Sequence, residues 1–296
     1  MMGTEPENDT HQDSGMDVRT FNIVALGDCN TCGVEGAAGQ IVPDYVANGL
    51  RARGLDCVLV NLGLTMCTTR EGLAKLRDHT GRIDLLLVNY GLVDAWTTSL
   101  PGLYLSYYPD HRVKIWARKL LKLFKRRLRS PWIRRWLPVG EVVSVTEYER
   151  NLRLMAEMAL ARSAETRIVF WGTAPVCDDL PRNRMIDRYN GIMRGVADTV
   201  PSVRYCDTPS ILAGRPLAEM MLDGVHLNAT ASGQVAAGIL ALCPGESEPG
   251  CRLPVEQATR GAERREACRS DRSRPTSECP SQCLTLSQDA ESVLPR

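Results

Sequence analysis

Short apolar runs alternate with helix-length segments along most of the chain, and this alternation limits the possible folds more than any other feature. Five runs have the length and composition of strands, at 22–26, 57–61, 84–89, 167–171 and 203–206. Helix-length segments lie between and after them, at about 34–53, 69–79, 146–163, 183–199 and 231–242. Thr146 and Glu149 make a capping box for the third of these helices. The alternation predicts a three-layer α/β/α fold with a flavodoxin-like, five-stranded parallel sheet.

The composition of the two ends differs from that of the segment between them. Residues 1–19 are polar and acidic, and residues 244–296 are rich in Pro, Ser, Arg and Glu without hydrophobic periodicity. Such segments cannot bury enough apolar surface to offset the entropy cost of ordering, so we expect a disordered leader and a disordered tail. The folded domain is then expected at 20–243, which is long enough to bury one large core.

The leader contains neither the basic segment nor the apolar segment of a secretion signal, and no apolar run reaches the roughly 18 residues of a membrane span. We therefore expect a cytoplasmic protein. In that compartment most of the eleven cysteines should be free thiols. The four cysteines in the tail have spacings that match no common zinc pattern and no histidine nearby, so no metal site is expected.

The first predicted strand leads into the segment Gly27–Thr31, which places the thiol of Cys29 on the turn before the next helix. Ligands of open parallel sheets bind beyond the carboxyl ends of the strands, where this turn lies. The N–H groups and the dipole at a helix N-terminus favour a thiolate, and the same N–H groups can hold an oxyanion. Cys29 is therefore a candidate nucleophile.

A nucleophile of this kind needs a base, and His226 is the best placed of the four histidines. It immediately precedes the last predicted helix, and Asp223 lies three residues before it. A carboxylate at that spacing can bond one imidazole nitrogen, fix the tautomer and leave the other nitrogen free to take a proton. The alternative is a loop histidine that lies near a loop aspartate by chance.

Four short motifs, each at a strand end, resemble those of the SGNH (GDSL-type) hydrolase superfamily over about residues 22–242. In chain order they are Gly27-Asp28-Cys29, Gly63, Gly91-Leu92-Val93-Asp94 and Asp223-x-x-His226. The resemblance implies the fold of that superfamily and an acyl-ester hydrolase or acyltransferase without a cofactor. It also implies a triad of Cys29, His226 and Asp223, with the backbone N–H groups of Cys29 and Gly63 as the oxyanion hole.

Two positions depart from the motifs of the superfamily. Cys29 stands in place of the serine, and because a thioester behaves differently on deacylation, hydrolysis and acyl transfer both stay open. Val93 stands in place of the asparagine of the oxyanion hole, and loss of one such donor typically costs about 10²–10³ in rate. Asn89 and the backbone N–H of Asn30 are candidate replacements. The other residues expected to support the site are Asp28, Gly91 and Asp94.

Two other interpretations use the same residues. A protein of this fold that has lost efficient catalysis, as Val93 suggests, would be a binding or scaffolding protein. Cys29 and Cys32 also form a Cys-x-x-Cys at a strand-to-helix turn, which is the setting of thiol–disulfide redox motifs. The redox interpretation leaves Asp223 and His226 without a role.

The alternation of strands and helices is interrupted at about 97–145, where we expect an insertion. Residues 110–140 contain eleven Lys or Arg and one carboxylate. Apolar residues recur among them at helical spacing, at Val113, Trp116, Ala117, Leu120, Phe124 and Leu128. A basic, amphipathic segment with tryptophans is typical of a helix that lies on a membrane surface, and a lid packed on the domain by its apolar side fits equally well. No nucleic-acid partner is expected, because no known binding module accompanies the charge.

Several residues near the predicted cleft bear on the substrate. Tyr107 and Tyr108 precede the basic segment, and aromatic rings there can stack on sugars or pack as a hydrophobic hinge. Arg182 and Arg184 can contact an anionic group or stay solvated. From the resemblance and the basic segment at about 111–137, we expect an O-acylated carbohydrate or a lipid-linked glycan as substrate, handled at the inner face of the membrane.

Overall fold

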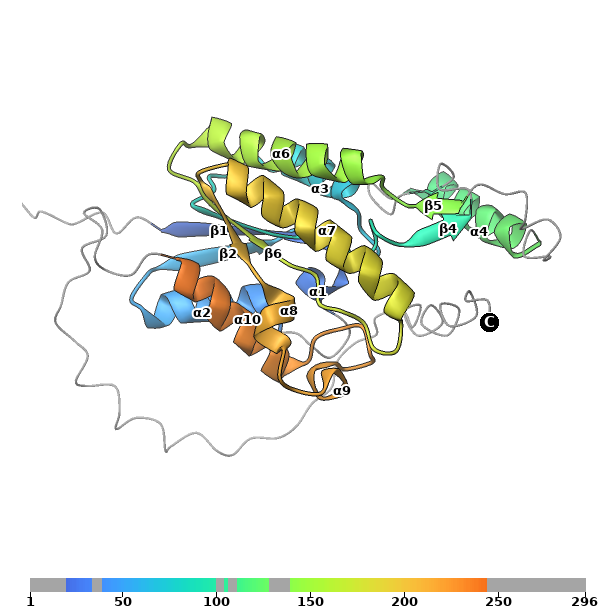
Figure 1. Cartoon of the computed structure of the whole chain (residues 1–296). Coiled ribbons are helices and arrows are strands. Elements are labelled where there is room, and N and C mark those ends of the chain that lie inside the picture. Colours follow the sequence, from blue (N-terminus) through green and yellow to red (C-terminus); the bar gives the residue numbers. More distant parts are fainter. Residues whose placement is uncertain (1–19, 34–38, 100–103, 106–110, 128–138, 244–296) are drawn as a thin grey trace, which may run out of the picture. The chain divides into compact units, whose positions relative to one another are not determined.

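The computed structural model of the chain describes residues 20–33, 39–99, 104–105, 111–127 and 139–243 (Figure 1). The expected leader and tail, together with Tyr107 and Tyr108, lie outside the described residues. Contacts divide the chain into two units, Met1–Cys251 and Arg252–Arg296. All structural statements below concern the first unit.

The centre of the fold is a parallel sheet with the strand order β2-β1-β3-β6-β7 (Figure 1). Its strands are β1 (Phe21–Gly27), β2 (Cys57–Asn61), β3 (Leu85–Asn89), β6 (Arg167–Trp171) and β7 (Val203–Cys206). In the register of the sheet, Ile23 of β1 lies opposite Leu59 of β2 on one side and Leu85 of β3 on the other. The predicted five-stranded parallel sheet is confirmed.

Alternate side chains of each strand enter two different cores, because successive residues of a strand point to opposite faces. Ile23 and Ala25 of β1 pack in the core covered by α2 (Val42–Ala52), α8 (Thr208–Leu212) and α10 (Ala229–Leu242). Val24 and Leu26 pack in the core covered by α3 (Thr69–Asp78), α6 (Val145–Arg162) and α7 (Leu180–Thr199). A sheet that is apolar on both faces needs a helical layer on each, and Figure 1 shows both layers.

Helices begin where a side chain caps them rather than at the first apolar residue of the periodic pattern. The hydroxyl of Ser144 accepts the N–H of Glu147, so Ser144 is the cap and α6 begins at Val145. Thr146 therefore lies inside the helix and does not cap it. The predicted capping box of Thr146 and Glu149 is therefore wrong. The carboxylate of Asp179 caps α7 in the same way, so that α7 begins at Leu180 rather than at 183.

Two short strands bracket the insertion predicted at about 97–145. β4 (Thr97–Ser99) pairs antiparallel with β5 (Val139–Glu141), and α4 (Arg112–Arg127) lies between them in the sequence. Neither strand was predicted from the sequence, because three residues carry too little periodicity to be recognised. Within the described part of the chain, no helix has the length and apolar character needed to cross a membrane.

β1 ends in a glycine because neighbouring segments come very close to this position. A Cβ atom at Gly27 would lie 2.0 Å from Oγ1 of Thr31 and 2.5 Å from the backbone oxygen of Asn89. This close approach fixes where α1 (Cys29–Cys32) sits against the end of β3, and it thereby positions Cys29.

We expect Gly27→Ala to lower the free energy of unfolding by about 1–3 kcal/mol, because an overpacked position forces its neighbours to shift. Gly191→Ala in α7 is the matched control, since a Cβ there meets no atom within 4 Å. The control should raise stability by about 0.5–1 kcal/mol, because alanine loses less backbone entropy in a helix. Denaturant unfolding of both variants measures the difference, and equal stabilities would contradict the close approach.

Candidate active site

Cys29 opens α1 directly after β1, as the sequence predicts. Asp28 caps this short helix: its Oδ1 accepts the N–H of Asn30 at 3.1 Å, and its backbone oxygen accepts the N–H of Cys32 at 3.0 Å. The expectation that the N–H of Asn30 replaces a missing oxyanion donor is therefore wrong. The Asp28 carboxylate already takes that donor.

The thiol of Cys29 lies in an apolar cluster with Leu92, Val176 and Ile186, and Val225 packs against the same cluster. Burial raises the pKa of the Cys29 thiol well above its ordinary value, and the neighbouring Asp28 and Cys32 raise it further. Its own backbone N–H and the charge of Arg182 act in the opposite direction. Burial therefore opposes the expected thiolate, and α1, with four residues, has only a small dipole to offset it.

The turn from Asp223 to His226 has the geometry of a base and the carboxylate that orients it. Oδ2 of Asp223 lies 2.7 Å from Nδ1 of His226. Oδ1 of Asp223 accepts the N–H groups of Val225 at 3.1 Å and of His226 at 2.9 Å. Burial acts to raise the pKa of Asp223, but these bonds bring it below its ordinary value. An ionised carboxylate on Nδ1 favours the tautomer in which Nε2 can accept a proton.

The side-chain amide of Asn30 joins the Cys29 turn to the Asp223–His226 turn. Its Oδ1 accepts the N–H of Leu227 at 3.0 Å, and its Nδ2 donates to the backbone oxygen of Val225 at 3.5 Å. These two bonds flank His226 on both sides. The described residues show no hydrogen bond between the thiol of Cys29 and His226. The amide of Asn30 is therefore the direct polar link between the two turns.

Hydrogen bonds also fix the loop before α7 against the Asp223–His226 turn. The N–H of Cys177 donates to the backbone oxygen of Gly224 at 2.8 Å. Asn183 exchanges two hydrogen bonds with the backbone of Val176, each at 2.8 Å. Gly224 has a φ of +81°, a conformation that favours glycine. The Cys29 cluster is thereby closed on the side of α7.

Gly63 lies beside α1 as expected, but its N–H is already bonded. A Cβ at Gly63 would come within 2.7 Å of the backbone nitrogen of Cys32. The N–H of Gly63 donates to Oδ1 of Asn61 at 2.9 Å, and Nδ2 of Asn61 donates to the backbone oxygen of Thr31 at 2.7 Å. An oxyanion would have to displace Asn61 from this N–H.

The other expected oxyanion donors contribute less. Val93 is buried and has no side-chain donor. Asn89, the expected replacement, is fully buried in the sheet, where its Nδ2 donates to the backbone oxygen of Trp171 at 2.7 Å. The expectation for Asn89 is wrong, because the bond to β6 uses its amide inside the sheet. Of the donors considered, the backbone N–H of Cys29 is the one that lies next to the sulfur of Cys29.

Gly91 and Asp94 shape the turn that carries Leu92 to Cys29. Gly91 has a φ of +136°, and a Cβ there would lie 2.8 Å from Oγ1 of Thr173. Asp94 is fully buried and accepts the N–H and the hydroxyl of Thr69 at 3.0 and 2.6 Å. Burial raises the pKa of Asp94 to about 7, although the bonds from Thr69 oppose this rise. Both residues act as structural supports.

Arg182 is a residue of the site that the sequence could not separate from Arg184. The side chain of Arg184 is exposed, whereas Nη2 of Arg182 donates to the backbone oxygen of Leu92 at 3.5 Å. The guanidinium carbon of Arg182 lies 5.6 Å from the centroid of the Trp96 ring. Burial raises the pKa of Asp28 to about 7, and the N–H of Asn30 and the charge of Arg182 oppose this rise.

The cysteines in the described residues, Cys29 and Cys32 among them, are free thiols. Sγ of Cys32 lies 3.2 Å from the backbone oxygen of Gly33 and 3.4 Å from Oγ1 of Thr65. Across the same residues, no group of three or more His, Cys, Asp or Glu side chains is arranged to hold a metal ion. The redox interpretation of Cys29 and Cys32 stays a prediction.

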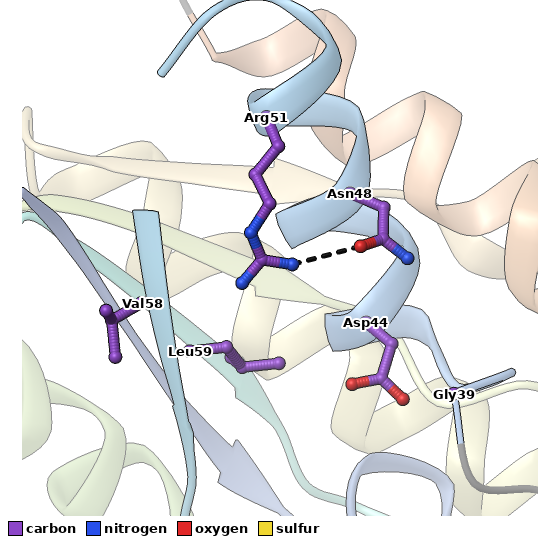
Figure 2. Close-up of a pocket in the computed structure, with 6 residues that line it drawn as sticks. All are labelled: Gly39, Asp44, Asn48, Arg51, Val58 and Leu59. Atoms are coloured by element: carbon purple, nitrogen blue, oxygen red, sulfur yellow. Dashed lines mark hydrogen bonds between the residues drawn. The ribbon is translucent and has the colours of Figure 1, made fainter. Parts of the chain in front are cut away.

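The surface hollow in Figure 2 is a separate feature of about 450 Å³ between α2 and β2, at an edge of the sheet. Asn48 and Arg51, both on α2, line one side of it and form a hydrogen bond of 3.0 Å. None of its lining residues belongs to the Cys29 or His226 turns. It contains no nucleophile or histidine, so it does not compete with Cys29 as the place of chemistry.

Comparison with known proteins identifies the family and the fold. The sequence matches the GDSL-like Lipase/Acylhydrolase family over residues 25–232, and no curated protein matches it. Its structure is similar to that of Axe2, an acetylxylan esterase from Geobacillus stearothermophilus, with 19% identity, a TM-score of 0.51 and coverage of 76% of this chain and 95% of that chain. It is also similar to LAE5, an alpha/beta hydrolase enzyme from the metagenome of Lake Arreo in Spain, with 21% identity, a TM-score of 0.50 and coverage of 75% and 94%. The structures share the fold, and the sequence match spans more than half of the chain. The protein therefore belongs to the GDSL-like lipase/acylhydrolase (SGNH) family.

Proposed function

We propose that the protein is an ester hydrolase or acyltransferase with Cys29 as nucleophile, His226 as base and Asp223 as the residue that orients the base. The observation that carries this proposal is the 2.7 Å bond between Asp223 and His226, in a turn that Asn30 ties to the Cys29 turn. Catalytic mutants of Axe2 support it, because they replace a serine, an aspartate and a histidine, the last two being three positions apart. Asp223 and His226 have that spacing.

The proposed chemistry begins from a protonated thiol, because burial raises the pKa of Cys29. Nε2 of His226 accepts the thiol proton as the sulfur bonds to the ester carbonyl carbon, and Asp223 stabilises the resulting imidazolium. The ester C–O bond then breaks, and the leaving alkoxide takes the proton from His226. The acyl group is left on Cys29 as a thioester. Water or an acceptor hydroxyl, deprotonated by His226, attacks the thioester and returns the thiol.

We further propose an O-acylated carbohydrate as the substrate. Axe2 is an acetylxylan esterase, and one of its variants is described as an acetyl-xylooligosaccharide esterase. A small acyl group suits an attacking sulfur that is almost fully buried among apolar side chains. A lipid-linked glycan at the inner face of a membrane is a more specific proposal for the substrate. This proposal requires that α4 contacts the membrane.

Hydrolysis of a short-chain p-nitrophenyl ester tests the nucleophile. We expect Cys29→Ala to reduce turnover to the background rate, and Cys29→Ser to retain part of it because His226 can also deprotonate a hydroxyl. Cys32→Ala is the matched control on the same helix and should stay active. Wild-type turnover that survives Cys29→Ala would rule out the triad, and equal loss in Cys29→Ala and Cys32→Ala would favour the redox interpretation.

A binding or scaffolding protein is the second candidate function, and two observations favour it. Val93 supplies no oxyanion donor, and the N–H of Gly63 is bonded to Asn61. Under this alternative, the wild type shows no ester turnover but binds an acetylated oligosaccharide. Isothermal titration calorimetry with that ligand, beside the hydrolysis assay, distinguishes the two functions.

We also propose that α4 contacts an anionic membrane surface. Eight of its 16 residues are Lys or Arg, and it contains no Asp or Glu. Its large apolar side chains are exposed: Val113 by 73%, Trp116 by 65% and Leu123 by 58%. A lid packed by its apolar side would cover these residues, whereas an anionic bilayer offers both an apolar phase and the opposite charge. The proposed occupant of this face is therefore a lipid surface.

Co-sedimentation with vesicles of phosphatidylcholine and phosphatidylglycerol tests this surface. We expect the double variant Trp116→Ser, Phe124→Ser to bind at least about tenfold more weakly, because burial of one large apolar side chain contributes about 1.5–3 kcal/mol. Leu154→Ser, an exposed leucine of α6, is the matched control and should bind like the wild type. Equal binding by all three proteins, or self-association through α4 without vesicles, would contradict the proposal.

A further inference from the structure

We infer that Arg182 supplies the positive charge that stabilises the oxyanion formed when Cys29 attacks an ester. The inference rests on the proposed function at Cys29, and it names a catalytic residue that the four sequence motifs do not contain.

The first support is the position of Arg182 relative to Cys29. Arg182 and Ile186 are four residues apart on α7, so they lie on the same face of this helix. Ile186 packs in the cluster that holds Cys29, together with Leu92. Nη2 of Arg182 donates to the backbone oxygen of Leu92. The thiol and the guanidinium therefore both lie beside Leu92, and Arg182 is on the face of α7 that packs Ile186 against Cys29.

The second support is electrostatic. The charge of Arg182 acts to lower the pKa of Cys29, and Cys29 acts to raise the pKa of Arg182, although burial dominates both shifts. A negative charge on the sulfur and the charge of the guanidinium thus stabilise each other. When the sulfur attacks a bound ester, the carbonyl oxygen becomes negative. Only the carbonyl carbon separates this oxygen from the sulfur, so the guanidinium stabilises the oxygen for the same reason.

The third support is that Arg182 has hydrogen-bonding capacity left over. Its Nε is buried and has no hydrogen-bond partner among the described residues. Its guanidinium otherwise contacts neutral groups, the backbone oxygen of Leu92 and the ring of Trp96. The described residues show no ion pair between Arg182 and Asp28, and burial raises the pKa of the Asp28 carboxyl to about 7. The charge of Asp179, the cap of α7, acts more strongly on the pKa of Arg182 than the charges of Cys29 and Asp28 do, but the buried Nε still has no partner among the described residues and can receive an anion.

The fourth support is that the site lacks other donors. Val93 has no side-chain amide, the N–H of Gly63 is bonded to Asn61, and the side-chain amide of Asn89 is bonded to the backbone oxygen of Trp171. The backbone N–H of Cys29 is left as one neutral donor. Hydrogen bonds from a charged donor are roughly twice as strong as neutral ones, so one guanidinium can replace the missing amide.

Steady-state kinetics on a p-nitrophenyl ester test the inference with Arg182→Gln, and Arg184→Gln on the same turn is the matched control. We expect Arg182→Gln to lower kcat by about 10²–10³ with little change in KM, because the interaction forms in the transition state. Arg184→Gln should keep wild-type values, since its side chain is exposed. Thermal unfolding verifies that both variants are folded.

A rescue variant separates catalysis from structure. Adding Val93→Asn to Arg182→Gln places an amide at the position of the missing donor, and it should restore kcat by about tenfold or more. A purely structural loss at Arg182 would not respond to this amide.

The possible failures are distinguishable. If turnover requires Cys29 but Arg182→Gln is as active as Arg184→Gln, or changes KM alone, the inference is overturned and the proposed function stands. If the wild type shows no turnover that depends on Cys29, the proposed function fails, and the inference fails with it.

Discussion

The amide of Asn30 makes the interaction on which the rest of the site depends. The sheet fixes the Cys29 turn through β1, but the Asp223–His226 turn lies 197 residues further along the chain and outside the sheet. The planar amide presents an acceptor and a donor side by side, and it bonds the backbone on both sides of His226. The bond from Cys177 to Gly224 also holds this turn, but the amide of Asn30 is the link that ties it to the turn that carries the sulfur.

Desolvation is the second physical constraint, and it determines the chemistry available to Cys29. An exposed thiol at a helix N-terminus could ionise without help, whereas a thiol buried among Leu92, Val176 and Ile186 holds its proton. In the proposed mechanism, His226 is therefore the base that the buried thiol needs, even though sulfur is a strong nucleophile. The same burial strengthens charge interactions in the site, which is the physical basis for the role proposed for Arg182.

The strands and the order of the site motifs were predictable because their signals are local. Val24 and Leu26 alternate with Ile23 and Ala25 within one strand, and both pairs are apolar because helices cover both faces of the sheet. The bond between Asp223 and His226 spans three residues, so spacing alone indicated it.

The partners of the individual polar groups were not predictable, because they depend on local turn geometry, as at Gly63, or come from distant segments, as at Asn89. In the sequence, the N–H of Gly63 and the amide of Asn89 were both candidate donors to an oxyanion. In the structure, the first donates to Asn61 and the second donates to the backbone oxygen of Trp171 in β6. Arg182 and Arg184 look alike in the sequence, where α7 was predicted to begin at 183. The Asp179 cap starts the helix earlier and turns Arg182 toward the site.

Mass spectrometry of the protein after brief exposure to an acetylated substrate tests the central claim most directly. The account predicts one acyl group on the peptide that contains Cys29, held as a thioester that neutral hydroxylamine removes and absent from Cys29→Ala. An unmodified Cys29 in a sample that is hydrolysing substrate, or the same acylation in Cys29→Ala, would contradict it.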